Sequence, residues 1–166
     1  YDVVGHIPQL PVARGSRNMK YLNQRDPKWG ANKIGASNLT IARYGCTLTC
    51  ISMLSDYFGS YMSPDRIAKE KMWFTKDGLV LWSKLNLPTM KFTWRQYGRN
   101  DARIMESLKS PNGGCILQVD NSHWVVAIRK TWLKNDYIIA NPWTGRIGTA
   151  LGDYKLITGS AHFVRK

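Results

Sequence analysis

A cysteine, a histidine and an asparagine are the residues of this sequence that could form a catalytic site together. Cys46 opens a stretch with helical periodicity, His123 opens an apolar strand and Asn141 ends the next one. A thiolate is a strong nucleophile, and a helix N-terminus beside an imidazole can lower the pKa of a thiol. If the two strands are antiparallel neighbours, His123 and Asn141 meet at one edge, as a base and the residue that orients it. The pattern predicts nucleophilic catalysis by a cysteine.

The remaining cysteines and histidines have simpler explanations. Cys50 lies one helical turn after Cys46, a separation poorly suited to a disulfide, and Cys115 begins an apolar strand. Both are expected to be structural, and at least one of the three thiols is expected to be free. His162 fits a last strand, and His6 lies in the N-terminal arm. Their spacing matches no metal-ligand pattern, so neither a metal nor a cofactor is expected.

The elements that must position these residues follow an α+β order. Apolar residues at helical spacing predict a buried helix from Cys46 to Phe58, ended by Gly59. Short helices are predicted over 65–72, 77–85 and 101–109, and a short strand leading into a turn over 21–30, whereas 35–45 is loop-like. Strands are predicted over 115–119, 123–129, 136–140 and 160–164. We expect the central helix to pack on this C-terminal antiparallel sheet.

Length and charge limit the class of protein. A chain of 166 residues fits one domain, which we place at 20–166 after an N-terminal arm or linker at 1–19. No apolar run is long enough to span a membrane. The first residues show neither a secretory signal nor an initiator Met, so a processed or excised segment is expected. The net charge of +13 favours attraction to an anionic surface. The basic residues are scattered, so nucleic acid is not the expected ligand, and a monomer is expected.

Four blocks of the sequence are familiar. YLNQRDPKWG at 21–30, GCTLTC at 45–50, SHWVV at 122–126 and NPWTG at 141–145 occur in this order. Together they resemble the C39-like peptidases, a compact branch of the papain-like cysteine peptidases. The resemblance covers about residues 20 to 165 and implies a papain-like fold.

The resemblance also implies a role for each matching residue. Cys46 matches the nucleophile, His123 the general base and acid, and Asn141 the residue that orients the imidazole. Gln24 matches the side-chain donor of an oxyanion hole that the backbone N–H of Cys46 completes. Many relatives have Asp before the proline where this chain has Asn141. An amide stabilises an imidazolium less than a carboxylate does, so the departure leaves the pH optimum open.

Residues next to these positions are candidates for substrate binding. Gly45 leaves room beside the thiol, and Trp124 and Trp143 are expected to wall a cleft. Trp29 is a weaker candidate for the same wall. A large aromatic side chain is, however, common in a core, so both interpretations stay open.

Three functions are compatible with the sequence. The first is hydrolysis of peptide cross-links in bacterial peptidoglycan, as in an endolysin, with the positive charge drawing the enzyme to anionic wall polymers. Such an enzyme would act at the cell wall or extracellularly. An enzyme of the phage type would be made in the host cytoplasm and then released. The alternatives are a peptidase that removes double-glycine leader peptides, and a catalytically silent papain-like module that binds anionic polymers. The bond that is cleaved is not encoded in any motif.

Overall fold

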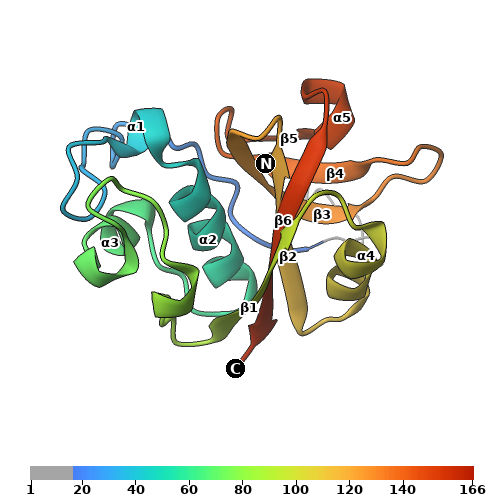
Figure 1. Ribbon diagram of the computed structural model, residues 1–166, viewed down its shortest axis with the longest axis horizontal. Coiled ribbons are helices and arrows are strands. Elements are labelled where there is room, and N and C mark those ends of the chain that lie inside the picture. Colours follow the sequence, from blue (N-terminus) through green and yellow to red (C-terminus); the bar gives the residue numbers. More distant parts are fainter. Residues whose placement is uncertain (1–16) are drawn as a thin grey trace, which may run out of the picture.

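The structure, a computed structural model, describes residues 17–166. This part of the chain forms an antiparallel sheet with helices against both of its faces, which confirms the predicted α+β class (Figure 1). The helices are α1 (Ile41–Tyr44), α2 (Cys46–Tyr57), α3 (Pro64–Ala68), α4 (Asp101–Lys109) and α5 (Ala150–Asp153), with 3-10 turns η1 (Lys71–Trp73) and η2 (Trp82–Lys84). The strands are β1 (Met90–Tyr97), β2 (Gly113–Val119), β3 (His123–Lys130), β4 (Tyr137–Asn141), β5 (Arg146–Thr149) and β6 (Ile157–Arg165).

The sheet has the strand order β1-β6-β2-β3-β4-β5, and every pair is antiparallel. Strands β2 to β4 form the predicted meander, and β5 continues it by one further strand. The turn between β2 and β3 is tight because Asp120 and Asn121 adopt the left-handed conformation, with φ of 50° and 57°. The last strand then returns along the free edge of β2, so that β6 lies in the middle of the sheet.

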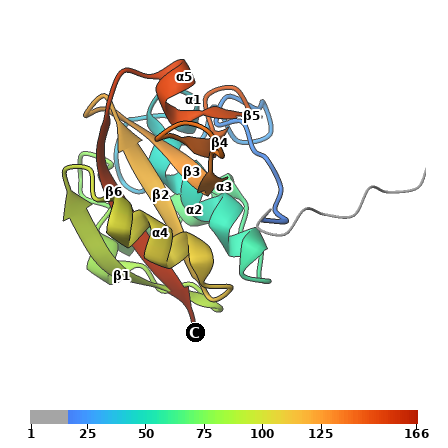
Figure 2. The same ribbon diagram turned by 90° about the vertical axis from the view of Figure 1, so that its right-hand side faces the viewer.

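Both faces of the central strands are buried. Side chains alternate between them: Ile116 and Val126 join the core on the α2 side, whereas Leu117 joins the core on the α4 side. Figure 2 shows α4 lying across the second face. Because neither face meets water, β2 and β3 are almost continuously apolar instead of alternating.

Helix α2 is the central buried helix that the sequence predicts. Its residues from Leu48 to Ser55 are all buried, and it packs against β3. The helix ends before Gly59, whose φ of +92° is a conformation that glycine adopts without strain. The fold therefore fixes Cys46 at the start of the most buried helix, directly above the sheet that carries His123.

Several local predictions were wrong. Residues 21–30 form a loop with turns and no strand, and the segment 35–45 contains the short helix α1. The helix predicted over 77–85 is reduced to η2, and 65–72 divides into α3 and the start of η1. Edge strands β1 and β5 were not predicted. Polar and charged residues interrupt their apolar pattern because much of each strand faces solvent.

The N-terminal segment packs against the domain where it is described. Arg17 is buried, and its guanidinium donates to carbonyl groups of Ser107 (2.9 Å), Leu108 (3.2 Å) and Gly113. Residues 1–16, which include most of the predicted arm at 1–19 and His6, lie outside the described residues. The domain boundary at 20 stays a prediction. In residues 17–166, helices are too short or too polar to cross a bilayer.

Candidate active site

Cys46 and His123 line the same cleft, which has a volume of about 340 Å³. One wall comes from the α1–α2 junction and the other from the start of β3, so residues 77 positions apart share one surface. The cleft is lined by Gln24, Leu39, Arg43, Tyr44, Cys46, Thr47, Gly78, Leu79, Gln118, Asn121, Ser122, His123, Trp124 and Trp143. The arrangement gives a thiol and an imidazole access to one bound molecule.

The imidazole of His123 is held by Asn141, as the hairpin pattern predicts. The distance between His123 Nε2 and Asn141 Oδ1 is 3.0 Å. The Asn141 oxygen also accepts the backbone N–H of Trp143 at 3.0 Å, and its Nδ2 donates to the Tyr154 hydroxyl at 2.9 Å. These bonds fix the amide orientation, so Nε2 of the neutral ring must carry the proton. The other ring nitrogen, Nδ1, is then unprotonated and able to accept a proton.

Tyr154 is a site residue that the sequence analysis missed. Besides accepting from Asn141, its ring lies 5.3 Å from the His123 ring, centre to centre, at 37°. The half-buried tyrosine thus contacts both members of the hydrogen-bonded pair. It follows α5, beyond β5, and no motif around it distinguishes it from a core aromatic residue.

Burial shifts the pKa of both Cys46 and His123 towards the neutral form. It raises the pKa of the Cys46 thiol, and the backbone N–H of Trp124 and the Thr47 hydroxyl oppose this effect only in part. Burial also lowers the pKa of His123, against the opposing hydrogen bond to Asn141. The expected drop of the thiol pKa at the helix N-terminus is therefore not found. Both shifts favour the neutral thiol and the neutral imidazole over a thiolate–imidazolium pair.

Gln24 lines the cleft with its side chain 1% exposed. Its backbone N–H donates to the Pro142 carbonyl at 2.8 Å, and this bond joins the loop that carries Gln24 to the loop after β4. The Nε2 group donates to Ala42 O at 3.1 Å and makes a longer contact of 3.5 Å with Ile41 O. Its Oε1 has no hydrogen-bond partner within residues 17–166. A buried acceptor without a donor is costly and therefore requires an explanation, of which a functional role is one.

The predicted substrate-binding residues divide into two groups. Trp124 and Trp143 both line the cleft, Trp143 with 41% of its surface exposed and with the Arg25 guanidinium 4.3 Å from its ring centre. Gly45 is buried and does not line the cleft. A Cβ there would lie 2.6 Å from the carbonyl oxygen of Ile41, so the glycine permits the α1–α2 junction and does not make room for substrate. Trp29 is buried in the core.

The cleft carries positive charge and no carboxylate among its lining residues. Arg43, in the last turn of α1, is exposed beside Cys46. In the described part of the chain its guanidinium lies over the Tyr44 ring and is within ion-pair distance of no carboxylate. A substrate with a carboxylate near the reacting bond would meet an unpaired cation here.

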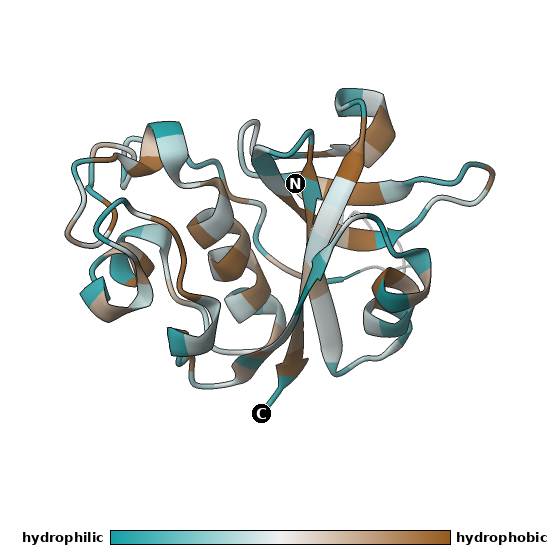
Figure 3. Cartoon of the chain, in the orientation of Figure 1, coloured by the Kyte–Doolittle hydropathy of each residue, from teal (hydrophilic) through white to brown (hydrophobic). Residues whose placement is uncertain are grey.

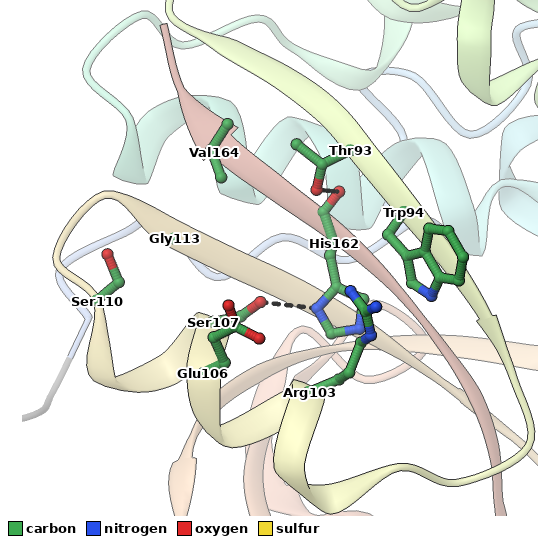
Figure 4. Close-up of a pocket in the computed structure, with 9 residues that line it drawn as sticks. All are labelled: Thr93, Trp94, Arg103, Glu106, Ser107, Ser110, Gly113, His162 and Val164. Carbon is green, nitrogen blue, oxygen red and sulfur yellow. Dashed lines mark hydrogen bonds between the residues drawn. The ribbon is translucent and has the colours of Figure 1, made fainter.

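The other candidate residues lie apart from this cleft. His162 belongs to a smaller cavity of about 190 Å³ on the α4 side of the sheet (Figure 4). Both of its ring nitrogens are engaged, by Ser107 at 2.7 Å and by Ser160 at 2.8 Å. Cys50 and Cys115 are free thiols that are fully buried. Over residues 17–166 we find no group of three or more His, Cys, Asp or Glu that could hold a metal ion.

Comparison with known proteins gives one result. The model of the Peptidase C39 family matches residues 38–154, which include Cys46, His123 and Asn141. Gln24 lies before the matched segment. The curated proteins and the solved structures contain no match to this chain.

Proposed function

The chain belongs to the Peptidase C39 family of cysteine peptidases, and from this premise we propose that Cys46, His123 and Asn141 form its catalytic triad. We propose further that its substrate is the peptide part of bacterial peptidoglycan. The observation that carries the proposal is the 3.0 Å bond from His123 Nε2 to Asn141, which leaves Nδ1 free in the cleft that Cys46 lines.

The reaction follows from the protonation states. As Cys46 Sγ attacks the substrate carbonyl carbon, its proton passes to His123 Nδ1, and a tetrahedral oxyanion forms. When the C–N bond breaks, the leaving amine takes this proton from Nδ1. Water then attacks the thioester with His123 again as the base, releasing the carboxylate product and the thiol.

Two donors can stabilise the oxyanion. The backbone N–H of Cys46 lies in the first turn of α2, where N–H groups have no acceptor within the helix. Gln24 supplies the second donor. Its Nε2 contact of 3.5 Å with Ile41 O is at the limit of a hydrogen bond, so this N–H is the one of the two that is available to the substrate, whereas the other is bonded to Ala42 O. Such a donor commonly contributes about 10²–10³ in rate.

Charge supports a substrate with carboxylates. Arg43 lines the cleft, and the net charge of +13 favours approach to an anionic wall. Peptidoglycan stem peptides carry free carboxylates, whereas a double-glycine leader has none at the cleavage site. A peptidase that removes double-glycine leader peptides stays the alternative, because it would use the same catalytic residues. The proposed place of action is the cell wall or the extracellular side, with synthesis in a host cytoplasm for an endolysin.

The test is the set of soluble products released from purified peptidoglycan. We expect the wild-type protein to release muropeptides that mass spectrometry identifies by one newly exposed peptide end, and Cys46→Ala to release none. Cys50→Ala is the matched control, because that thiol lies one turn deeper in α2 and outside the cleft. Cleavage of a double-glycine leader with walls left intact would favour the alternative, and wall binding without any cleavage would favour the silent module.

A further inference from the structure

The β3–β4 hairpin ends in two large apolar side chains that nothing in the described part of the chain covers. Trp132 is 91% exposed and Leu133 is 85% exposed, more than the other large apolar residues of that part. In Figure 3 the tip of this hairpin is hydrophobic between hydrophilic flanks, and it projects beyond the rest of the sheet. Two adjacent apolar side chains at this exposure lose the free energy that burial would give them.

The loop that carries these residues is held in shape. The Thr131 hydroxyl donates to Lys134 O at 2.6 Å, and the Thr131 backbone N–H donates to Asp136 O at 2.9 Å. Arg99, outside the hairpin, donates to Asn135 O at 2.7 Å. Trp132 and Leu133 therefore sit at the closed end of a braced turn, and their exposure is built into the fold.

Basic side chains surround the apolar tip. Arg129, Lys130 and Lys134 are all exposed within four positions of it. The nearest acidic residue in the hairpin, Asp136, is buried, and its Oδ1 accepts the backbone N–H groups of Tyr137 and Leu151. The surface at the tip thus combines an apolar end with basic residues on both flanks of the turn.

We propose that this tip, Trp132 and Leu133 with Lys130 and Lys134, inserts into the surface of an anionic lipid bilayer. Positive charge alone attracts any polyanion, wall polymers included, but it gives no reason for Trp and Leu at the tip. A bilayer provides hydrocarbon for Leu133, an interface for Trp132 and anionic headgroups for the lysines. The tip and His123 lie at opposite ends of β3, so binding there leaves the cleft open to substrate.

Sedimentation with vesicles tests the proposal. We expect the wild-type protein to bind vesicles of phosphatidylglycerol and not those of phosphatidylcholine. Trp132→Ser with Leu133→Ser should weaken binding about tenfold or more, and Lys130→Gln with Lys134→Gln about tenfold. Met72→Ser with Leu156→Ser, which changes two other exposed apolar residues, is the matched control and should bind as the wild type does. Cleavage of a soluble peptide should be equal in all four proteins.

A second measurement locates the contact. Brominated phosphatidylglycerol quenches tryptophan that enters the bilayer, so Trp132→Phe should still bind while most of the quenching disappears. The proposal is overturned if the wild type binds neither kind of vesicle, or if the tip variant binds as tightly as the wild type. It is also overturned if the tip variant keeps vesicle binding and loses binding to purified cell walls. These readouts do not depend on peptidase activity, so they stand apart from the proposed function.

Discussion

His123 lines the cleft and His162 packs against α4, and the comparison contrasts the proposed catalytic imidazole with a structural one. His123, on the cleft side, makes one hydrogen bond through Nε2 and keeps Nδ1 free. His162, on the α4 side, has hydroxyl partners at both nitrogens and is 5% exposed. Burial lowers the pKa of both residues, and that of His162 to about 4. A shifted pKa thus does not distinguish the two histidines, whereas a free ring nitrogen in the cleft that Cys46 lines favours His123 as the proposed base.

The same substitution at both histidines should give the largest difference. His123→Gln removes the base and should lower kcat/KM at least about 10³-fold. His162→Gln breaks two buried hydrogen bonds but touches nothing in the cleft, so kcat/KM should stay close to that of the wild type below the melting temperature. Steady-state kinetics of the two variants on one peptide substrate checks this contrast. Equal losses in the two variants would remove the distinction between the two histidines.

Acid should destabilise the protein through His162. Its pKa is about 4 in the folded protein, mainly because of burial and then because of Arg103, and about 6.5 in the unfolded chain. The unfolded state therefore binds the proton more readily, and stability is full above pH 6.5 and falls as the pH drops towards 4. The loss reaches about 3 kcal/mol.

Urea denaturation between pH 7 and pH 4 measures this loss, and His162→Gln should be less dependent on pH over that range. A variant with the same pH dependence as the wild type would show that other groups cause the acid sensitivity.

The smallest effect is expected at Tyr154, which we describe as a positioning residue. Tyr154→Phe removes the acceptor of the Asn141 amide but keeps the ring beside His123. One hydrogen bond of about 1 kcal/mol corresponds to about a fivefold loss in kcat/KM, and the acid limb of the pH–rate profile should shift with it. Tyr137→Phe, which breaks a 2.6 Å bond to Asp101 away from the cleft, is the control and should lower stability without moving that limb.

The sequence predicts the elements that are buried or tightly patterned. Helix α2, helix α4 and strands β2 to β4 carry strong apolar signals, and the polar turn at 120–122 makes β2 and β3 neighbours. The contact between His123 and Asn141 follows from the same local reasoning, because adjacent strands join them. Edge strand β1 gives no such signal, since four of its eight residues are exposed and three are only partly buried.

The features of the site that the sequence did not predict depend on contacts that sequence spacing does not encode. Tyr154 reaches Asn141 only after β5 and α5 have turned the chain back. Gly45 was expected to face substrate, but the sequence does not show that Ile41 packs against it. The raised pKa of Cys46 is likewise a result of burial by distant segments, which outweighs the favourable helix terminus.

Labelling with iodoacetamide, followed by peptide mass spectrometry and residual activity on the same samples, tests the central claim most directly. The account predicts that the label accumulates on Cys46, that activity falls in proportion, and that the buried Cys50 and Cys115 stay unmodified. His123→Gln should slow the labelling of Cys46, because the variant lacks the imidazole that accepts the thiol proton. Full modification of Cys46 with activity retained, or activity lost with only the other two thiols modified, would contradict the account.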